Sequence, residues 1–284
     1  MSRRTIPDPL KLWFTTASLL FLGIGLWLPC WGHAEVVRIG GTGSGLATMS
    51  ALAKAFQSRN PEFQFEIIPS LGSSGGIKAV SSGTIQIALS NRALKPAEAV
   101  AGLQADEYAR TPFVFVTSKS GVKDLALTQI AAIYAGRQPQ WHDGSPVRLV
   151  LRDFGDSDNT VIAAMSPEMK EAVLTAHKRK GLRIALNDQE GVDAVEELSG
   201  GFGASTLALV RSENRRVNVL AVNGVEPTIE NLKNGRYPYF KEMHLIHFDV
   251  NASVQVKKFL GFIRSSAGQG LMTQLGNLPV KAVR

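Results

Sequence analysis

Residues 63–90 read FQFEIIPSLGSSGGIKAVSSGTIQIALS. An apolar, β-rich segment at 63–69 leads into the glycine- and serine-rich turn GSSGG at 72–76, and a second such segment follows at 84–90. The pattern of residues 74–82, between the turn and the second segment, is typical of a short helix. A strand, a crossover helix and a strand in this order predict two parallel strands of one sheet.

The preceding stretch repeats this unit. The segment VVRIG at 36–40 predicts a strand, which ends in the turn GTGSG at 41–45. Apolar residues from Leu46 to Phe56 then recur at helical spacing until Pro61 stops the helix. Strands and helices therefore alternate from the start of this region, and the sequence predicts an α/β fold with parallel-rich sheets and helices on both faces.

Further strands and helices alternate along the rest of the chain. Strands are expected at 111–118, 147–152, 182–185, 202–210, 217–222 and 243–250, and helices at 128–136, 160–165, 168–179, 192–200, 253–264 and 268–276. Two sets of such units, the second inserted into the first, predict two lobes with a ligand cleft between them. We assign residues 35–116 and 221–284 to lobe 1 and residues 117–220 to lobe 2.

The first 34 residues predict a cleavable signal peptide. Arg3, Arg4 and Lys11 give it a positive start, residues 12–29 carry no charge, and small residues mark a cleavage site before Glu35. An uncleaved membrane anchor is the alternative, because the apolar run is at the lower edge of the length that spans a bilayer. The sequence leaves open whether export follows the Sec or the Tat route.

Composition narrows the function further. The chain has 284 residues, of which 44% are hydrophobic and 19% charged, which is an ordinary globular balance. Its single cysteine, Cys30, lies inside the predicted signal peptide, so the exported chain offers no disulfide, cysteine-ligated metal or cysteine nucleophile. Because residues 1–34 carry three basic residues and one acid, the formal charge falls from +7 to +5 on export. The basic excess is spread along the chain, and no nucleic-acid partner is expected.

Three glycine-, serine- or aspartate-rich turns each follow a predicted strand and open a predicted helix. They are GTGSG (41–45), GSSGG (72–76) and DFGDSDN (153–159). Helix N-termini at the carboxyl ends of parallel strands point free N–H groups into a common crevice, which suits an anion. Arg152 precedes the third turn, where its guanidinium is suited to bidentate binding of an oxyanion. A structural ion pair with an aspartate of that turn is the alternative.

The turn GSSGG also matches the G-x-S-x-G pattern that presents a nucleophilic serine, here Ser74. A serine hydrolase needs a histidine base, and the candidates downstream are His142, His177, His244 and His247. Their settings are a proline-bearing loop, a basic surface stretch and an alternating strand pattern, which favour non-catalytic roles. Their spacing is not that of metal ligands either. We therefore expect no enzyme, no metal and no cofactor, with a hydrolase that uses Ser74 as a remote alternative.

Four segments together give a resemblance to a known family. They are GTGSGL (41–46), LGSSGGIKAVSSGTIQIALSNRAL (71–94), LTQIAAIYAGRQPQW (127–141) and FLGFIRSSAGQGLM (259–272). Over nearly its whole exported length the chain resembles the periplasmic phosphate-binding proteins of ABC transporters, which have the two-lobed type II periplasmic binding protein fold. The resemblance implies a monomeric periplasmic protein that closes on inorganic phosphate or a similar oxyanion. It also implies delivery of that ligand to ABC permease subunits in the inner membrane.

The resemblance further implies a set of ligand-binding residues: Ser44, Gly45, Leu46, Ser73, Asn91, Arg152, Asp156 and Ser157. Asn91 departs from the family pattern, because the family has an aspartate there that accepts the proton of hydrogen phosphate. The family's R-x-x-x-S-G-T turn reads R-D-F-G-D-S-D-N here, so that Ser157 aligns only with a shift of one residue. Asp156 or Asp158 either replaces the missing acceptor or neutralises Arg152. A protein of the same fold with a changed ligand, or with a sensor or scaffold role, is the alternative.

Overall fold

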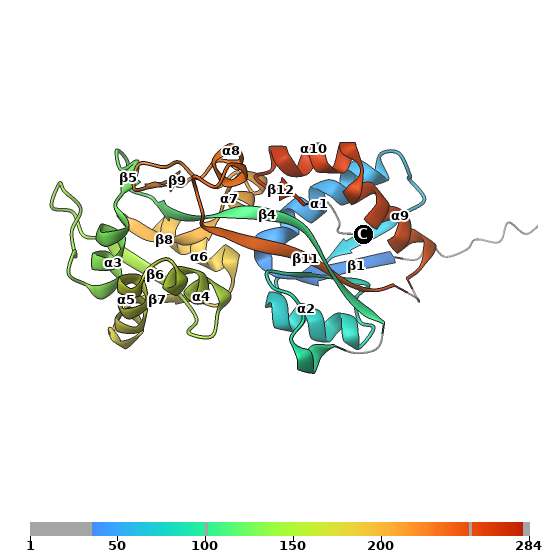
Figure 1. Ribbon diagram of the computed structural model, residues 1–284, viewed down its shortest axis with the longest axis horizontal. Coiled ribbons are helices and arrows are strands. Elements are labelled where there is room, and N and C mark those ends of the chain that lie inside the picture. The colour runs from blue at the N-terminus through green and yellow to red at the C-terminus, as the bar shows by residue number, and fades with distance from the viewer. Residues whose placement is uncertain (1–35, 100–101, 250–251, 281–284) are drawn as a thin grey trace, which may run out of the picture. The chain divides into compact units, whose positions relative to one another are not determined.

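The computed structural model describes residues 36–99, 102–249 and 252–280 (Figure 1). The predicted signal peptide lies outside these residues. Within them, no helix combines the length and the apolar character that are needed to cross a bilayer.

The first five elements have the alternating order that the sequence predicts. They are β1 (Val36–Gly41), α1 (Gly43–Gln57), β2 (Gln64–Ile67), α2 (Gly72–Ser81) and β3 (Ile87–Ser90). Strand β1 pairs in parallel with β2 on one side and with β3 on the other. The carboxyl ends of the three strands therefore meet at one edge of the sheet, together with the turns that follow them.

A second group of alternating elements follows. It comprises α3 (Leu127–Ala135), β6 (Arg148–Arg152), α4 (Ser157–Ala164), α5 (Pro167–Lys178), β7 (Arg183–Ala185), α6 (Asp188–Glu197) and β8 (Gly201–Thr206). Strand β6 lies between β7 and β8 and runs parallel to both. Arg152 therefore stands at the carboxyl end of the central strand of this group.

Two long strands, β4 (Leu103–Thr117) and β11 (Phe240–Phe248), join the two groups (Figure 1). They pair antiparallel with each other, β11 also pairs with β3, and the last part of β4 pairs with β8. The strand order is β2-β1-β3-β11-β4-β8-β6-β7, so the sheet is mixed and is parallel only within each group. The charged stretch 103–110, which we did not expect to be a strand, becomes one through its pairing with β11.

Shorter and C-terminal elements complete the described chain. They are the 3-10 turn η1 (Pro96–Glu98), β5 (Asp124–Leu125), α7 (Leu207–Ser212), β9 (Asn218–Val219), β10 (Ala221–Val222), α8 (Ile229–Lys233), α9 (Val254–Arg264), α10 (Ser266–Gln274) and β12 (Leu278–Pro279). The strand predicted at 202–210 is wrong in its second half. There the Thr206 hydroxyl accepts a hydrogen bond from the N–H of Leu209 and starts α7.

Helices α4 and α6 begin three and four residues earlier than predicted, and both early starts bring polar residues to the site. Helix α4 begins three residues early, at Ser157, because the Asp156 carboxylate accepts a hydrogen bond from a backbone N–H of its first turn. Helix α6 begins four residues early, at Asp188, because the side-chain oxygen of Asn187 caps it in the same way. Such caps satisfy backbone donors that a helix leaves free at its start.

Aromatic rings gather in two separate hydrophobic clusters. Beside β1–β3, the Phe56 ring of α1 packs against Phe259 of α9 with a centroid distance of 5.6 Å. In the second group, Phe115 of β4 stacks on Phe202 of β8 at 5.8 Å. Separate clusters are what two lobes need for independent cores. The lobe boundaries after 116 and 220 stay a prediction.

Candidate functional site

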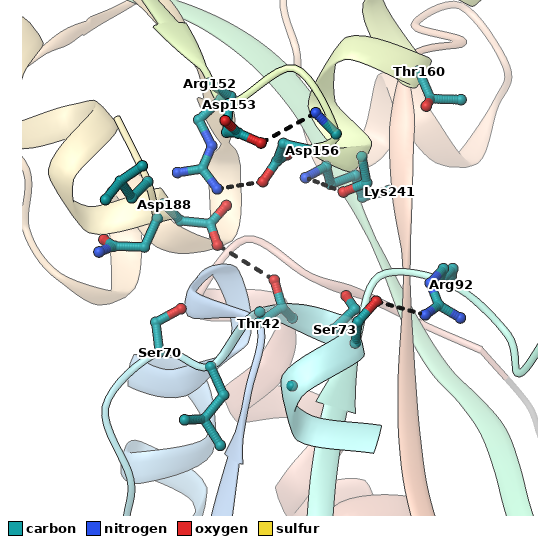
Figure 2. A pocket seen from close by; sticks show the side chains of 18 of the residues that line it. Thr42, Ser70, Ser73, Arg92, Arg152, Asp153, Asp156, Thr160, Asp188 and Lys241 are labelled. Carbon is teal, nitrogen blue, oxygen red and sulfur yellow. Dashed lines mark hydrogen bonds and ion pairs between the residues drawn. The ribbon is translucent and has the colours of Figure 1, made fainter. Parts of the chain in front are cut away.

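A cleft of about 670 Å³ lies where the ends of the parallel strands meet. Its lining comes from the turn at 70–75 after β2, from the end of β6 and the turn after it, and from the turn between β7 and α6. The residues of the last two parts are Arg152, Asp153, Gly155, Asp156, Ser157, Thr160, Leu186, Asn187, Asp188 and Glu190, and Thr42, Arg92, Lys95 and Lys241 complete the lining. Figure 2 shows Thr42 and Ser73 on one side of the cleft and Arg152 on the other. Both groups of elements therefore contribute to one pocket.

The cleft brings together half of the predicted ligand residues. Ser73, Arg152, Asp156 and Ser157 line it. The other four lie outside the lining that the described residues form: Ser44, Gly45 and Leu46 in the first turn of α1, and Asn91 directly after β3. The Leu46 side chain packs in the hydrophobic core, so its predicted role depends on its N–H alone.

Glycine allows β1 to turn into α1 close to β3. Gly41 has a φ of 126°, and a Cβ there would stand 2.1 Å from the carbonyl oxygen of Leu89. That conformation and that space admit only glycine. The next residue, Thr42, is the N-cap of α1, and its N–H donates to the Leu89 oxygen at 2.9 Å. This turn holds the N-terminus of α1 at the cleft.

Four helices begin at the cleft, and they differ in how their first N–H groups are satisfied. Helices α4 and α6 are capped by the side chains of Asp156 and Asn187. In the described chain, the N-cap residues of α1 and α2 provide no side-chain cap. Free N–H groups and the helix dipole make such ends favourable for an anion.

A hydrogen-bond network links the first two turns to the end of β3. The backbone N–H of Asn91 donates to Ser73 Oγ at 3.0 Å, so the Ser73 hydroxyl keeps its own proton to donate into the cleft. The side-chain oxygen of Asn91 accepts from Thr42 Oγ1 at 2.7 Å and from Ser44 Oγ at 3.0 Å. Its amide nitrogen donates to the carbonyl oxygen of Glu242 at 3.3 Å. Asn91 thus holds the turns together, with its side-chain oxygen and nitrogen both engaged.

Arg152 is a buried cation of the site, with 7% of its surface exposed. Its Nη2 lies 2.5 Å from the Asp156 carboxylate, so the ion pair that the sequence left open is present. Within the described part of the chain, Nε and Nη1 have no hydrogen-bond partner. Burial acts to lower the pKa of Arg152, but the carboxylates of Asp188, Asp158 and Asp156 outweigh it and raise the pKa. Two charged N–H donors of this cleft-lining residue are therefore buried without a hydrogen bond.

Lys241 of β11 and Asp158 of α4 form an ion pair beside Arg152, and both are almost fully buried. Burial raises the pKa of Asp158 to about 6, helped by the negative charges of Asp156 and Asp188 and opposed by Lys241 and Arg152. Burial acts to lower the pKa of Lys241, but the three carboxylates outweigh it and raise the pKa. The pair therefore binds β11 to the first turn of α4.

Asp188, the first residue of α6, reaches the N-terminus of α1 (Figure 2). Its Oδ2 accepts a hydrogen bond from the N–H of Ser44 at 3.2 Å and lies 3.3 Å from Thr42 Oγ1. Next to it, Gln189 donates through Nε2 to the carbonyl oxygen of Gly43 at 3.0 Å. A Cβ at Gly43 would stand 2.2 Å from Gln189 Oε1, so the glycine permits this approach. The N-termini of α1 and α6 are therefore in direct contact at the cleft.

Sequence reasoning missed Thr42, Asp188 and Lys241 as residues of the site. Thr42 lies inside the turn GTGSG, where the resemblance implies Ser44 and Gly45 as the ligand residues instead. Asp188 was placed before its helix, although Asn187 followed three residues later by glutamate is a capping signal that predicts the earlier start. Lys241 lies two residues before the strand predicted at 243–250, and no local signal marks it as a site residue.

Ser74 lies in the first turn of α2, where Leu71 holds the N-cap position. Its Oγ accepts a hydrogen bond from Arg92 Nη2 at 3.0 Å. The same guanidinium forms a bidentate ion pair with Glu98 at 2.6 and 2.7 Å, and this hydrogen bonding lowers the pKa of Glu98 to about 2. The Ser74 oxygen thus faces a permanent cation that cannot act as a base.

The histidines with hydrogen-bonding neighbours have them elsewhere. His177, His244 and His247 lie within hydrogen-bond distance of Asn159, Glu242 and Asp106 respectively. The ranges that the structure covers hold no cluster of three or more histidine, cysteine, aspartate or glutamate side chains that could bind a metal ion.

Comparison with known proteins gives consistent matches along most of the chain. A family model described as the PBP superfamily domain matches residues 32–267. The phosphate-binding protein PstS of Borreliella burgdorferi is 22% identical over 217 residues, which cover 74% of this chain and 78% of that protein. The PstS of Bacillus subtilis is 23% identical over 254 residues, which cover 86% of this chain and 80% of that protein. A solved Clostridium perfringens structure, assigned as a phosphate ABC transporter substrate-binding protein and containing phosphate, is 28% identical. Its TM-score is 0.72, with 87% of this chain and 100% of that chain covered.

Proposed function

This chain belongs to the PBP superfamily, and on that basis we propose that it is a periplasmic solute-binding protein that captures phosphate or a closely related oxyanion for an ABC transporter. The relatives support this proposal, because two are phosphate-binding proteins and the solved structure contains phosphate. Capture and delivery require no chemical step, so the proposed role is not that of an enzyme. Removal of residues 1–34 would release the protein into the periplasm, where inner-membrane permease subunits are its partners.

One observation carries the choice of an anion as ligand: the uncapped N-terminus of α2 and the buried guanidinium of Arg152 line the same cleft. On one side, the Ser73 hydroxyl and the first N–H groups of α2 offer neutral donors. On the other, Nε and Nη1 of Arg152 are charged donors that make no hydrogen bond in the described chain, although Nε lies 3.9 Å from Asp158 Oδ2. An oxyanion between them takes up hydrogen bonds that are otherwise unmade.

Hinge closure of the cleft completes the proposed mechanism. The N-termini of α1 and α2 belong to the predicted lobe 1, residues 35–116 with 221–284, and Arg152 belongs to lobe 2, residues 117–220. An anion that contacts both sets of donors stabilises the closed arrangement relative to the open one. The permease then distinguishes the closed, loaded protein from the open one.

Isothermal titration calorimetry tests the proposal. The full chain is expressed, and the exported protein is purified and titrated with phosphate, sulfate and perchlorate at two pH values on either side of the second ionisation of phosphate. We expect saturable binding of phosphate. Failure of every oxyanion to bind would refute the proposed function, whereas binding of singly charged anions alone would favour the protein with a changed ligand.

A further inference from the structure

Asp188 lies where an anionic ligand is expected. Helix α1 has 15 residues and its N-cap residue provides no side-chain cap, so its first N–H groups need an acceptor from elsewhere. Asp188 supplies one, because its Oδ2 accepts from the N–H of Ser44 at 3.2 Å. A carboxylate of the protein therefore occupies the end of α1 that favours anions.

The neighbouring hydroxyls hold Asp188 only weakly. Thr42 has a single hydroxyl proton, and its 2.7 Å contact with Asn91 uses that proton. The 3.3 Å contact between Thr42 and Asp188 is the longer and weaker of the two. Ser44 Oγ also donates to Asn91, at 3.0 Å. Asp188, which is partly exposed, is thus held at α1 by one backbone N–H and the helix dipole, a contact that an incoming anion can replace.

The guanidinium of Arg152 points to a ligand at the same place, independently of the helix. Arg152 is 7% exposed and lines the cleft, yet its Nε and Nη1 find no acceptor among the described residues. Figure 2 shows its guanidinium on the same side of the cleft as Asp156, above Asp188. Unpaired charged donors in a buried position are costly unless a ligand satisfies them.

Asp188 differs from Asp156 and Asp158 in having no direct ion pair in the described chain. Asp156 pairs with Arg152, and Asp158 pairs with Lys241. In the part of the chain that the structure covers, no Lys or Arg nitrogen lies within ion-pair distance of Asp188. Asp188 therefore acts on Arg152 and Lys241 only at longer range, and its direct contact is with the positive end of α1.

We propose that Asp188 determines specificity: its carboxylate occupies the N-terminus of α1 as an internal anion, and an oxyanion ligand binds by displacing it. The inference rests on the proposed oxyanion-binding function of the same cleft. Because the displaced carboxylate stays near the ligand, its repulsion grows with the ligand's charge. Asp188 therefore lowers the affinity for doubly charged anions more than the affinity for singly charged ones.

The variant Asp188→Asn separates charge from shape. The amide keeps an oxygen that can accept from Ser44, but it removes the negative charge. Glu197→Gln is the matched control, because it makes the same change of net charge at the exposed opposite end of α6. The exported wild-type protein and both variants are titrated with phosphate, sulfate and perchlorate, of which the last two are tetrahedral anions of different charge. Thermal unfolding verifies that each variant is folded.

We expect Asp188→Asn to bind phosphate roughly tenfold or more tightly than the wild type, with a larger gain for sulfate than for perchlorate and no such gain in Glu197→Gln. If the wild type binds phosphate and Asp188→Asn binds it no more tightly, the inference is overturned and the proposed function stands. An equal gain for sulfate and perchlorate, or an equal gain in Glu197→Gln, also overturns it. Absence of oxyanion binding in all three proteins refutes the inference and the proposed function together.

Discussion

Replacing Ser73 by alanine removes one donor from the proposed anion site without changing any charge. The Ser73 oxygen accepts from the N–H of Asn91 at 3.0 Å, and its hydroxyl proton is available to a ligand in the cleft. Alanine therefore loses a hydrogen bond to the anion and an acceptor within the fold. The first loss lowers ligand affinity, and the second lowers the free energy of unfolding.

The two effects differ in size. A hydrogen bond to a charged group contributes about 1.5–3 kcal/mol, so Ser73→Ala should weaken phosphate binding roughly 10- to 150-fold. Loss of the acceptor for a partly buried N–H should cost about 1 kcal/mol of the free energy of unfolding. Thr42 and Ser44 keep their hydrogen bonds to Asn91, so the surrounding turns should stay in place.

Calorimetry measures the loss of affinity, and chemical denaturation measures the loss of stability. Ser82→Ala is the matched control, because Ser82 lies at the opposite end of α2 and its hydroxyl donates to the carbonyl oxygen of Ala79. Unchanged phosphate affinity in Ser73→Ala, or an equal loss in Ser82→Ala, would show that the anion does not bind at the N-terminus of α2.

Three other substitutions test separate parts of the site. Arg152→Lys keeps the positive charge but loses the planar guanidinium and its paired N–H donors. Phosphate affinity measured by calorimetry should therefore fall roughly tenfold or more, and wild-type affinity would contradict a bidentate contact between Arg152 and the anion. Gly41→Ala places a Cβ 2.1 Å from the Leu89 carbonyl oxygen, and the free energy of unfolding should fall by about 3 kcal/mol or more in urea denaturation; wild-type stability would contradict the close approach. Because the pKa of Asp158 is raised from 3.8 to about 6, the folded state binds its proton more tightly than the unfolded state does. The resulting stabilisation is present below about pH 4 and is lost as pH rises through about 6, so Asp158→Asn should show a smaller loss of unfolding free energy over that range; equal slopes would contradict the raised pKa.

Local signals in the sequence are sufficient for the elements that precede the cleft. Glycine turns directly after short apolar strands predict β1, α1, β2 and α2, because the conformations that glycine supplies and the helical spacing after it depend on neighbouring residues. Arg152 is found in the same way, since it ends a strand and precedes a turn rich in aspartate. Its ion pair with Asp156 is also local, as the two residues are four positions apart in the sequence.

Contacts between distant residues account for what the sequence does not reveal. Lys241 lies 83 positions from Asp158 and 84 from Ser157, and only the pairing of β11 with β4 brings it to the cleft. Asp188 lies 144 positions from Ser44, and its contact requires α6 to meet α1. Asn91 is a third example. The sequence shows that it replaces the aspartate of the family, but only the structure shows its hydrogen bonds to Thr42 and Ser44.

Carboxylates of the protein occupy donors at the cleft, and this determines what an entering anion must displace. Its affinity is the difference between the contacts it gains and the internal contacts that it replaces. The internal carboxylates are not equivalent, however. Asp158 is 2% exposed and paired with the buried Lys241, so removing it would leave an unpaired charge in the interior. Asp188 is partly exposed and is held mainly by the N–H of Ser44. Displacement should therefore fall on Asp188, while Asp158 keeps Lys241 in place in both the free and the loaded protein.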